Sequence, residues 1–233
     1  MKWHFLYRTF LLCLKGVPTT LLITILTLVF SSIPAIGIAV IRSKRVPVLQ
    51  KICSVYVSFI RGTPAIVQIY LLYNTLASIL TVWFEKNNVS INVFDISPIV
   101  FAVIVFTLNI TATMSEVVRS ALLTVDKGQM EAAVSIGLSE LQGFLRVVFP
   151  QALVSAIPNL CTLIVNLIKM TSLAFAMTVK DITAIAKIEA GSSYNYIEAY
   201  LDIFVIYLIL CIVIEKMFQK LERNLSRYKA IAD

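Results

Sequence analysis

Polar side chains that could bind or move a solute occur at a few positions inside, or at the ends of, long apolar runs in this 233-residue sequence. Ionisable groups at membrane depth are costly, so they usually face a cavity or a partner. Amides and hydroxyls at such depth either hydrogen-bond between helices or line a path for a polar solute. The residues we consider for such a path are Gln68, Asn109, Glu116, Lys169, Thr171 and Ser172.

Each of these positions also has a reading that involves no ligand. Glu116 can pair with Arg119 at the membrane interface, and Lys169 can extend its ammonium to the outer headgroups. The amides and hydroxyls can join packed helices. The functional alternative is that Glu116 or Lys169 holds the carboxylate or the amine of a substrate.

The sequence shows few residues or motifs that could support enzymatic catalysis. There is one histidine, His4, and there is no Gly-rich phosphate loop of the GxxxxGK[ST] type. The four cysteines have neither metal-ligand nor CxxC spacing, so we interpret them as small apolar residues. We therefore expect no catalytic residues, no metal site, no cofactor bound by this chain, and no enzyme activity of its own.

The composition predicts an integral membrane protein. Apolar residues make up 59% of the chain and charged residues 14%, against about 45–50% and about 25% in soluble domains. The apolar runs are long and do not alternate, so helices are favoured over a barrel. The net charge of +7 is explained by basic residues that flank membrane spans, so we expect no nucleic-acid partner.

Uncharged runs predict five membrane-spanning helices within a transmembrane domain at residues 16–221. Residues 1–15 read as an amphipathic segment at the interface, residues 46–60 as a separate helix near the cytoplasmic surface, and residues 222–233 as a cytoplasmic tail. The predicted spans are Gly16–Ile41, Gly62–Phe84, Ile96–Ser115, Val147–Ile168 and Tyr200–Ile214.

The placement of lysine and arginine predicts that the N-terminus lies outside and the C-terminus in the cytoplasm. With that orientation, twelve of the 20 basic residues fall on the cytoplasmic side and six outside, and two lie at membrane depth. The positive-inside rule favours this arrangement. The loop at residues 126–150 is then cytoplasmic.

That loop has the pattern of a rigid protrusion. Ala132 and Ala133 favour a helix with a small-residue surface, and Gly137 permits a backbone turn that other residues resist. Ser139 and Gln142 have the spacing of a capping box that starts a second helix. A helix, a glycine turn and a capped helix form a knob suited to a socket on another protein.

The spacing of this loop resembles the EAA motif of ATP-binding cassette (ABC) importer permeases. The family pattern is Glu-Ala-Ala, three residues, Gly, nine residues, Ile, any residue and Leu-Pro. This sequence has Glu131–Ala133, Gly137, Val147, Phe149 and Pro150 at those positions. The resemblance implies the type I importer permease architecture and an ABC ATPase that docks on Glu131, Ala132, Ala133 and Gly137.

The same resemblance implies further partners and a location. ATP and Mg would be bound by the ATPase, and a second permease chain, the same or similar, would complete the membrane unit. An extracytoplasmic solute-binding protein would deliver the substrate. The location would be the bacterial inner membrane.

Other segments resemble the polar amino-acid group of these permeases. They are Arg61-Gly62-Thr63-Pro64 with Gln68, Glu116 with Arg119, and Lys169 with Thr171-Ser172-Leu173. Ser120 and Met170 depart from residues that are common in that group. The expected function is alternating-access import of amino acids. The alternatives are import of another small polar solute, or an ion-driven secondary transporter, for which the usual inverted repeat is not evident.

Overall fold

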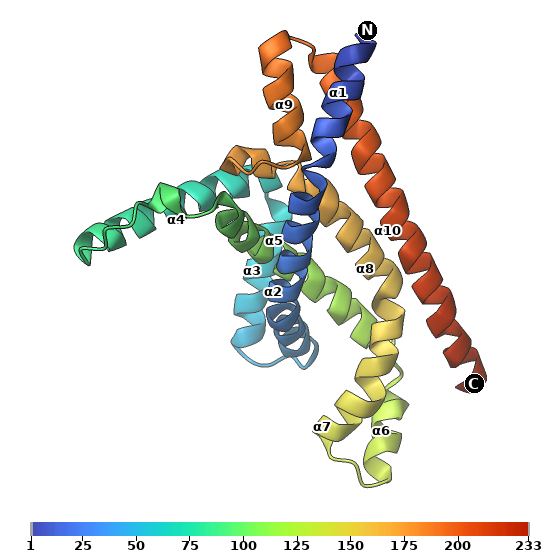
Figure 1. Cartoon of the computed structure of the whole chain (residues 1–233). Helices are drawn as coiled ribbons and strands as arrows, with labels where there is room; N and C mark the ends of the chain where they lie inside the picture. Colours follow the sequence, from blue (N-terminus) through green and yellow to red (C-terminus); the bar gives the residue numbers. More distant parts are fainter. Residues whose placement is uncertain (1, 233) are drawn as a thin grey trace.

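The structure is a computed structural model that describes residues 2–232, with side chains described as far as residue 225. Over this range the chain forms helices and no strands (Figure 1). The α-helices are α1 Trp3–Leu14, α2 Val17–Ser43, α3 Leu49–Gly62, α4 Ala65–Lys86, α5 Pro98–Leu123, α6 Lys127–Ser135, α7 Glu140–Gly143, α8 Phe149–Thr171, α9 Ile182–Ser193 and α10 Tyr196–Ala232.

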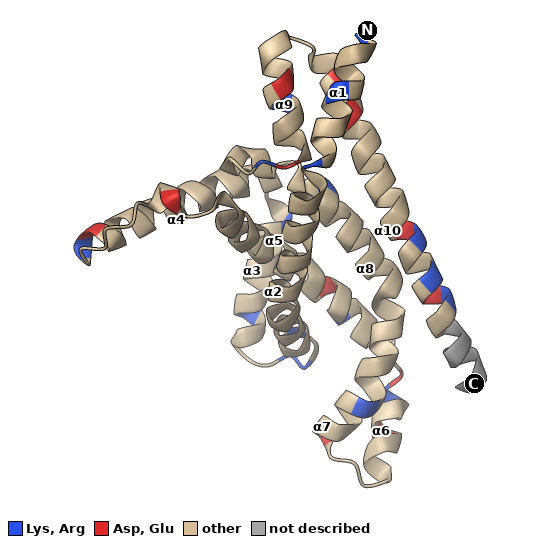
Figure 2. Cartoon of the chain, in the orientation of Figure 1, with Lys and Arg blue, Asp and Glu red and all other residues tan. Residues whose placement is uncertain are grey.

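The prediction of an all-α protein with five spans is confirmed. Five helical stretches in the described chain are long and apolar enough to cross a membrane. They are Trp3–Ser43, Ala65–Lys86, Pro98–Leu123, Glu140–Thr171 and Tyr196–Leu225. Charged side chains gather toward the helix ends and loops, and the central stretches of most spans carry few (Figure 2).

Besides the first stretch, which includes α1, three spans extend well beyond the bounds that the sequence predicts. Helix α5 continues beyond Ser115 to Leu123, because Glu116 is paired inside the protein and does not end the helix. The fourth span begins at Glu140, since a π-helical turn at Phe144–Val148 joins α7 to α8. Helix α10 starts at Tyr196 and runs through the residues predicted as a tail; Arg227 and Lys229, used in the charge count, lie outside the described side chains.

Helix α5 lies at the centre of the fold, packed against α2, α3, α4 and α8. Its buried residues Ala102, Val105, Phe106 and Ile110 form a core with Leu163 and Leu167 of α8 and with other side chains of α2 and α4. Such a continuous apolar core holds α5 and α8 in a fixed relation. These two helices flank the loop that contains α6 and α7 (Figure 1).

Helix α1, helix α9 and the first part of α10 pack together into a second unit, which lies at the end of the molecule where the N-terminus is (Figure 1). Cys13, Ile182, Ala186 and Ile206 are buried in its core. The predicted boundary at residue 15 coincides with the break between α1 and α2. The interfacial position of α1 in a membrane stays a prediction.

Gly16 makes this packing possible. A Cβ atom at residue 16 would lie 2.5 Å from the backbone nitrogen of Ile182 and 2.7 Å from the carbonyl carbon of Asp181. Backbone atoms cannot turn aside as a flexible side chain can. The break between α1 and α2 therefore contacts the start of α9 directly, backbone to backbone.

Helix α4 leaves the bundle as an arm (Figure 1). Its apolar side chains Val67, Leu71, Ile79, Val82 and Trp83 are each more than half exposed. Lipid or a neighbouring protein must cover them in a membrane.

We predict that Gly16→Ala lowers the stability of the protein by about 1–3 kcal/mol, the usual cost of overpacking a filled site. The measurement is the melting temperature of the detergent-purified chain. Gly37→Ala is the control, because a Cβ at residue 37 would meet no atom within 4 Å. Equal melting temperatures for Gly16→Ala and the parent would contradict the prediction.

Candidate coupling hairpin and solute path

The loop between α5 and α8 folds into the predicted helical hairpin. Asp126 caps the start of α6, and its carboxylate accepts a hydrogen bond from the Gly128 N–H at 2.6 Å. Gly137 has φ +89°, the left-handed region that favours glycine. Ser139 and Gln142 form the expected capping box, with distances of 3.3 and 3.0 Å.

The two alanines of the motif have different roles in the hairpin. Ala133 is buried, and a Cβ at Gly143 would lie 3.3 Å from its methyl group and 2.9 Å from the Met130 sulfur. Small residues at 133 and 143 therefore let α6 and α7 approach each other. Glu131 and Ala132 are exposed and free to meet a partner.

The tip of the hairpin is apolar. Ile136 is 80% exposed and Leu141 67% exposed, on either side of Gly137. An exposed apolar tip on a polar hairpin marks a protein-interaction surface.

The hairpin is joined to the fourth span without a flexible linker. The N–H of Phe149 donates to the carbonyl of Phe144, five residues back, as in a π-helix. Pro150 follows and has no N–H to offer the preceding turn. Helical structure thus runs without a break from Glu140 to Thr171.

The Gln68 side chain supplies a missing hydrogen bond at the break between α3 and α4. Pro64 has no N–H to donate to the carbonyl of Ile60, four residues earlier. The side-chain amide of Gln68 donates to this carbonyl at 2.7 Å and reaches the carbonyl and hydroxyl oxygens of Thr63 at 3.0 and 2.5 Å. The Gln68 carbonyl oxygen accepts from the Asn109 amide at 2.7 Å. Two of the predicted path residues are therefore brought together, and their side chains join α4 to the middle of α5.

Glu116 lies between two arginines. Its carboxylate pairs with Arg42 of α2 and, at 3.0 Å, with Arg119 of α5. Arg42 also donates to the Ser54 hydroxyl of α3 at 3.2 Å. The group joins three helices, and the sequence had suggested only the Arg119 pair. Both carboxylate oxygens are occupied in this structure.

Thr171 is fully buried and belongs to a hydrogen-bonded network at the C-terminal end of α8. Its hydroxyl donates to the Ile168 carbonyl at 2.6 Å and lies 3.5 Å from the hydroxyl of Tyr207 on α10. Tyr207 donates to Asp181 at 3.3 Å, and Asp181 caps α9 by accepting from the Ala184 N–H at 2.8 Å. Burial raises the pKa of the Asp181 carboxyl from 3.8 to about 6, although these donors stabilise its charged form. Asp181 and Tyr207 were not predicted as functional residues.

One face of α8 carries an exposed polar stripe, which we define as Ser155, Asn159, Thr162, Asn166 and Lys169. The spacing of four, three, four and three residues puts all five on one side of the helix. Ser155 is partly exposed and the other four are exposed. Within the described side chains, neither Asn159 nor Asn166 makes a side-chain hydrogen bond. Lys169 is the only predicted site residue in the stripe; Ser172, near its end, donates to the Lys169 carbonyl at 2.7 Å.

The four missed residues had a signal in the sequence; they are Ser155, Asn159, Thr162 and Asn166. They repeat with helical spacing through a run that must cross the membrane. A face of this kind cannot rest against lipid without cost. It therefore faces water, solute or another polypeptide.

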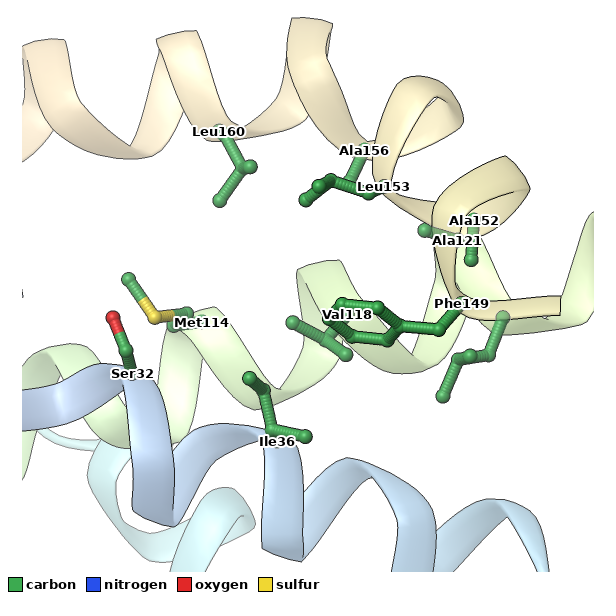
Figure 3. A pocket seen from close by; sticks show the side chains of 11 residues that line it. Ser32, Ile36, Met114, Val118, Ala121, Phe149, Ala152, Leu153, Ala156 and Leu160 are labelled. Carbon is green, nitrogen blue, oxygen red and sulfur yellow. The ribbon is translucent and has the colours of Figure 1, made fainter. Parts of the chain in front are cut away.

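The neighbouring face of α8 is apolar and borders a cavity of about 130 Å³ between α2, α5 and α8 (Figure 3). Ala152, Ala156 and Leu160 contribute from α8, and Ser32 of α2 supplies the one hydroxyl group in the lining. Since the cavity offers so few polar partners, the stripe is the better surface for a polar solute.

Comparison with known proteins agrees with this architecture. Residues 32–227 match the family described as binding-protein-dependent transport system inner membrane component. A probable amino-acid ABC transporter permease protein, PatM of Vibrio harveyi, is 40% identical over 194 residues, which cover 83% of this chain and 82% of PatM.

The chain belongs to this family of inner membrane components. The L-cystine transport system permease protein TcyB of Bacillus subtilis is 35% identical, with 99% of this chain and 94% of TcyB covered. The crystal structure of an amino acid ABC transporter with histidines has a TM-score of 0.79 and 25% identity, covering 96% of this chain and 99% of that chain. The predictions of the family and of the type I importer permease fold are thus confirmed.

For a permease of this family, Gln68 is expected to be a major contributor to stability. Gln68→Leu would leave the Ile60 carbonyl and the Asn109 amide without partners in apolar surroundings, at about 1–3 kcal/mol for each unpaired group. Asn109→Leu removes a single hydrogen bond. We therefore predict a larger drop in melting temperature for Gln68→Leu than for Asn109→Leu; the reverse order would contradict this account.

The raised pKa of Asp181 predicts a pH-dependent stability. The folded state binds this proton more tightly than the unfolded chain, so the stabilisation is complete below pH 3.8 and is lost as the pH rises through about 6. The shift corresponds to about 3 kcal/mol at most. Asp181→Asn keeps an oxygen to cap α9 but cannot titrate.

The measurement compares melting temperatures of the permease and Asp181→Asn between pH 5 and pH 7.5. The parent should gain stability relative to the variant as the pH is lowered. Parallel curves across this range would show that Asp181 does not titrate there.

Proposed function

We propose that this permease imports amino acids by alternating access, driven by a separate ABC ATPase. The observation that carries the proposal is the polar stripe along α8, which gives a membrane-spanning helix one face suited to a polar solute. A zwitterion loses its water on entering the membrane, and an unpaired polar group there costs several kcal/mol. Amides and hydroxyls spaced along the span offset this loss. The names of PatM and TcyB favour amino acids over other small polar solutes.

In this proposal the ATPase docks on the coupling hairpin through Glu131, Ala132 and the apolar tip around Gly137. Ala133 supports the docking surface from beneath. ATP and Mg are bound by the ATPase. Closing of the ATPase dimer moves the hairpin, and α8 moves with it because helical structure is continuous between them.

The path requires a second permease chain, identical or similar. The stripe is exposed along α8 in the part of the chain that the structure describes, and two stripes that face each other would enclose a polar channel. The exposed arm α4 offers an apolar surface that the second chain can cover. An extracytoplasmic binding protein would deliver the solute to the outer end.

The proposed orientation follows the basic residues, with the N-terminus outside and the C-terminus in the cytoplasm. The coupling hairpin and the ATPase are then on the same side of the inner membrane. Gln68, Asn109, Glu116 and Thr171 are hydrogen-bonded within the protein and support the packing of the spans. Lys169 and Ser172 lie at the outer end of the path.

The test is Gly137→Leu in the complete importer, reconstituted with its ATPase and binding protein. Leucine resists the φ of +89° at this position. We expect normal membrane insertion, loss of ATPase copurification and a loss of uptake of at least tenfold.

Gly37→Leu is a matched control at an open helical position. This variant should copurify with the ATPase and take up amino acids as the parent does. Full uptake by Gly137→Leu, with the ATPase at normal yield, would refute the docking role. Failure of the parent complex to take up any amino acid would refute the proposed substrate class.

A further inference from the structure

The charge that a solute meets along α8 comes from one side chain. Of the five residues in the stripe, only Lys169 has an ionisable side chain. Its side chain is exposed, and among the described side chains no carboxylate forms an ion pair with it. The stripe therefore presents two amides and one hydroxyl at its centre, from Asn159, Asn166 and Thr162. The ammonium of Lys169 lies toward its outer end.

The residue beside Lys169 brings no negative charge. Met170 packs against the core that contains Phe106 and Leu167. Glu215 and Lys216 are neighbours on α10, the helix that packs against α8, and among the described side chains Glu215 forms no ion pair with Lys169. The ammonium of Lys169 is thus left available to a ligand.

The other acidic groups near the spans are not available to a cationic solute. Glu116 is held by Arg42 and Arg119, and this group of three carries a net positive charge. Asp181 is fully buried and accepts from Ala184 and Tyr207. Asp202 is 2% exposed, on α10, outside the stripe.

We propose that Lys169 sets the charge preference of the path: it binds the carboxylate of the solute, favours amino acids of zero or negative net charge, and disfavours cationic ones. The inference rests on the proposed function and names the substrate class of the same path. A zwitterion or an anion presents a carboxylate to the ammonium. A cationic amino acid brings a second positive group to a stripe that carries no carboxylate among its five residues, where charges interact more strongly than in water.

The experiment measures binding directly, because a binding protein imposes a specificity of its own. The purified permease assembled with its ATPase, without the binding protein, is titrated with labelled glutamate, glutamine and arginine. We expect glutamate and glutamine to bind at least tenfold more tightly than arginine. Lys169→Gln should weaken glutamate binding about tenfold and reduce its advantage over arginine to less than threefold.

Lys180→Gln is the matched control, since it removes the same charge from the loop before α9. It should leave the ratio of affinities unchanged. Arginine binding as tight as glutamate in the parent, or an unchanged ratio in Lys169→Gln, would overturn the inference, as would an equal change in Lys180→Gln. Absence of measurable binding of all three amino acids would also overturn it. Uptake by the complete importer, measured in parallel, tests the proposed function separately. If the importer carries arginine best, the proposal of amino-acid import stands and the proposed role of Lys169 is refuted.

Discussion

The structure depends on one constraint, that peptide groups in apolar surroundings must find hydrogen-bond partners inside the protein. Helices meet it along their length, and the breaks between helices show how it is met elsewhere. At the α3–α4 break, the Gln68 side chain takes the place of the N–H that Pro64 lacks. At the start of α9, Asp181 caps the helix while Gly16 lets another backbone approach within contact distance. At both breaks a side chain close to the break supplies the missing hydrogen-bond partner.

The same constraint applies to charge, and it sorts the ionisable residues by function. Glu116 is costly in isolation, so it is held by two arginines and becomes a connection between α2, α3 and α5. Lys169 has no such partner and remains exposed on α8. A paired group supports the scaffold, whereas an unpaired group at the surface of a span is the one that a solute can use.

Much of the fold could be predicted from the sequence, because hydrophobic length and the spacing at Glu131, Gly137 and Ser139 are local properties. The span boundaries were less certain because tertiary pairing overrides local signals, as with Glu116 within α5. The site was harder for the same reason. Gln68 and Asn109 were correctly singled out as polar residues, but only the structure shows that they bind each other. The stripe on α8 was missed because its residues were not considered as one helical face.

The π-helical turn at Phe144–Val148 has a geometric consequence for α8. A π turn holds about one residue more than an α turn, and each residue rotates a helix by about 100°. If this turn relaxed to α geometry, α8 would rotate against the hairpin by roughly that angle. Each residue of α8 would then move to the place of the residue that follows it, so Ser155 and Asn159 would take the places of Ala156 and Leu160. Val154 and Pro158 would take the places of Ser155 and Asn159. The register of a single turn therefore determines whether the fourth span presents a polar or an apolar face to whatever lies opposite it.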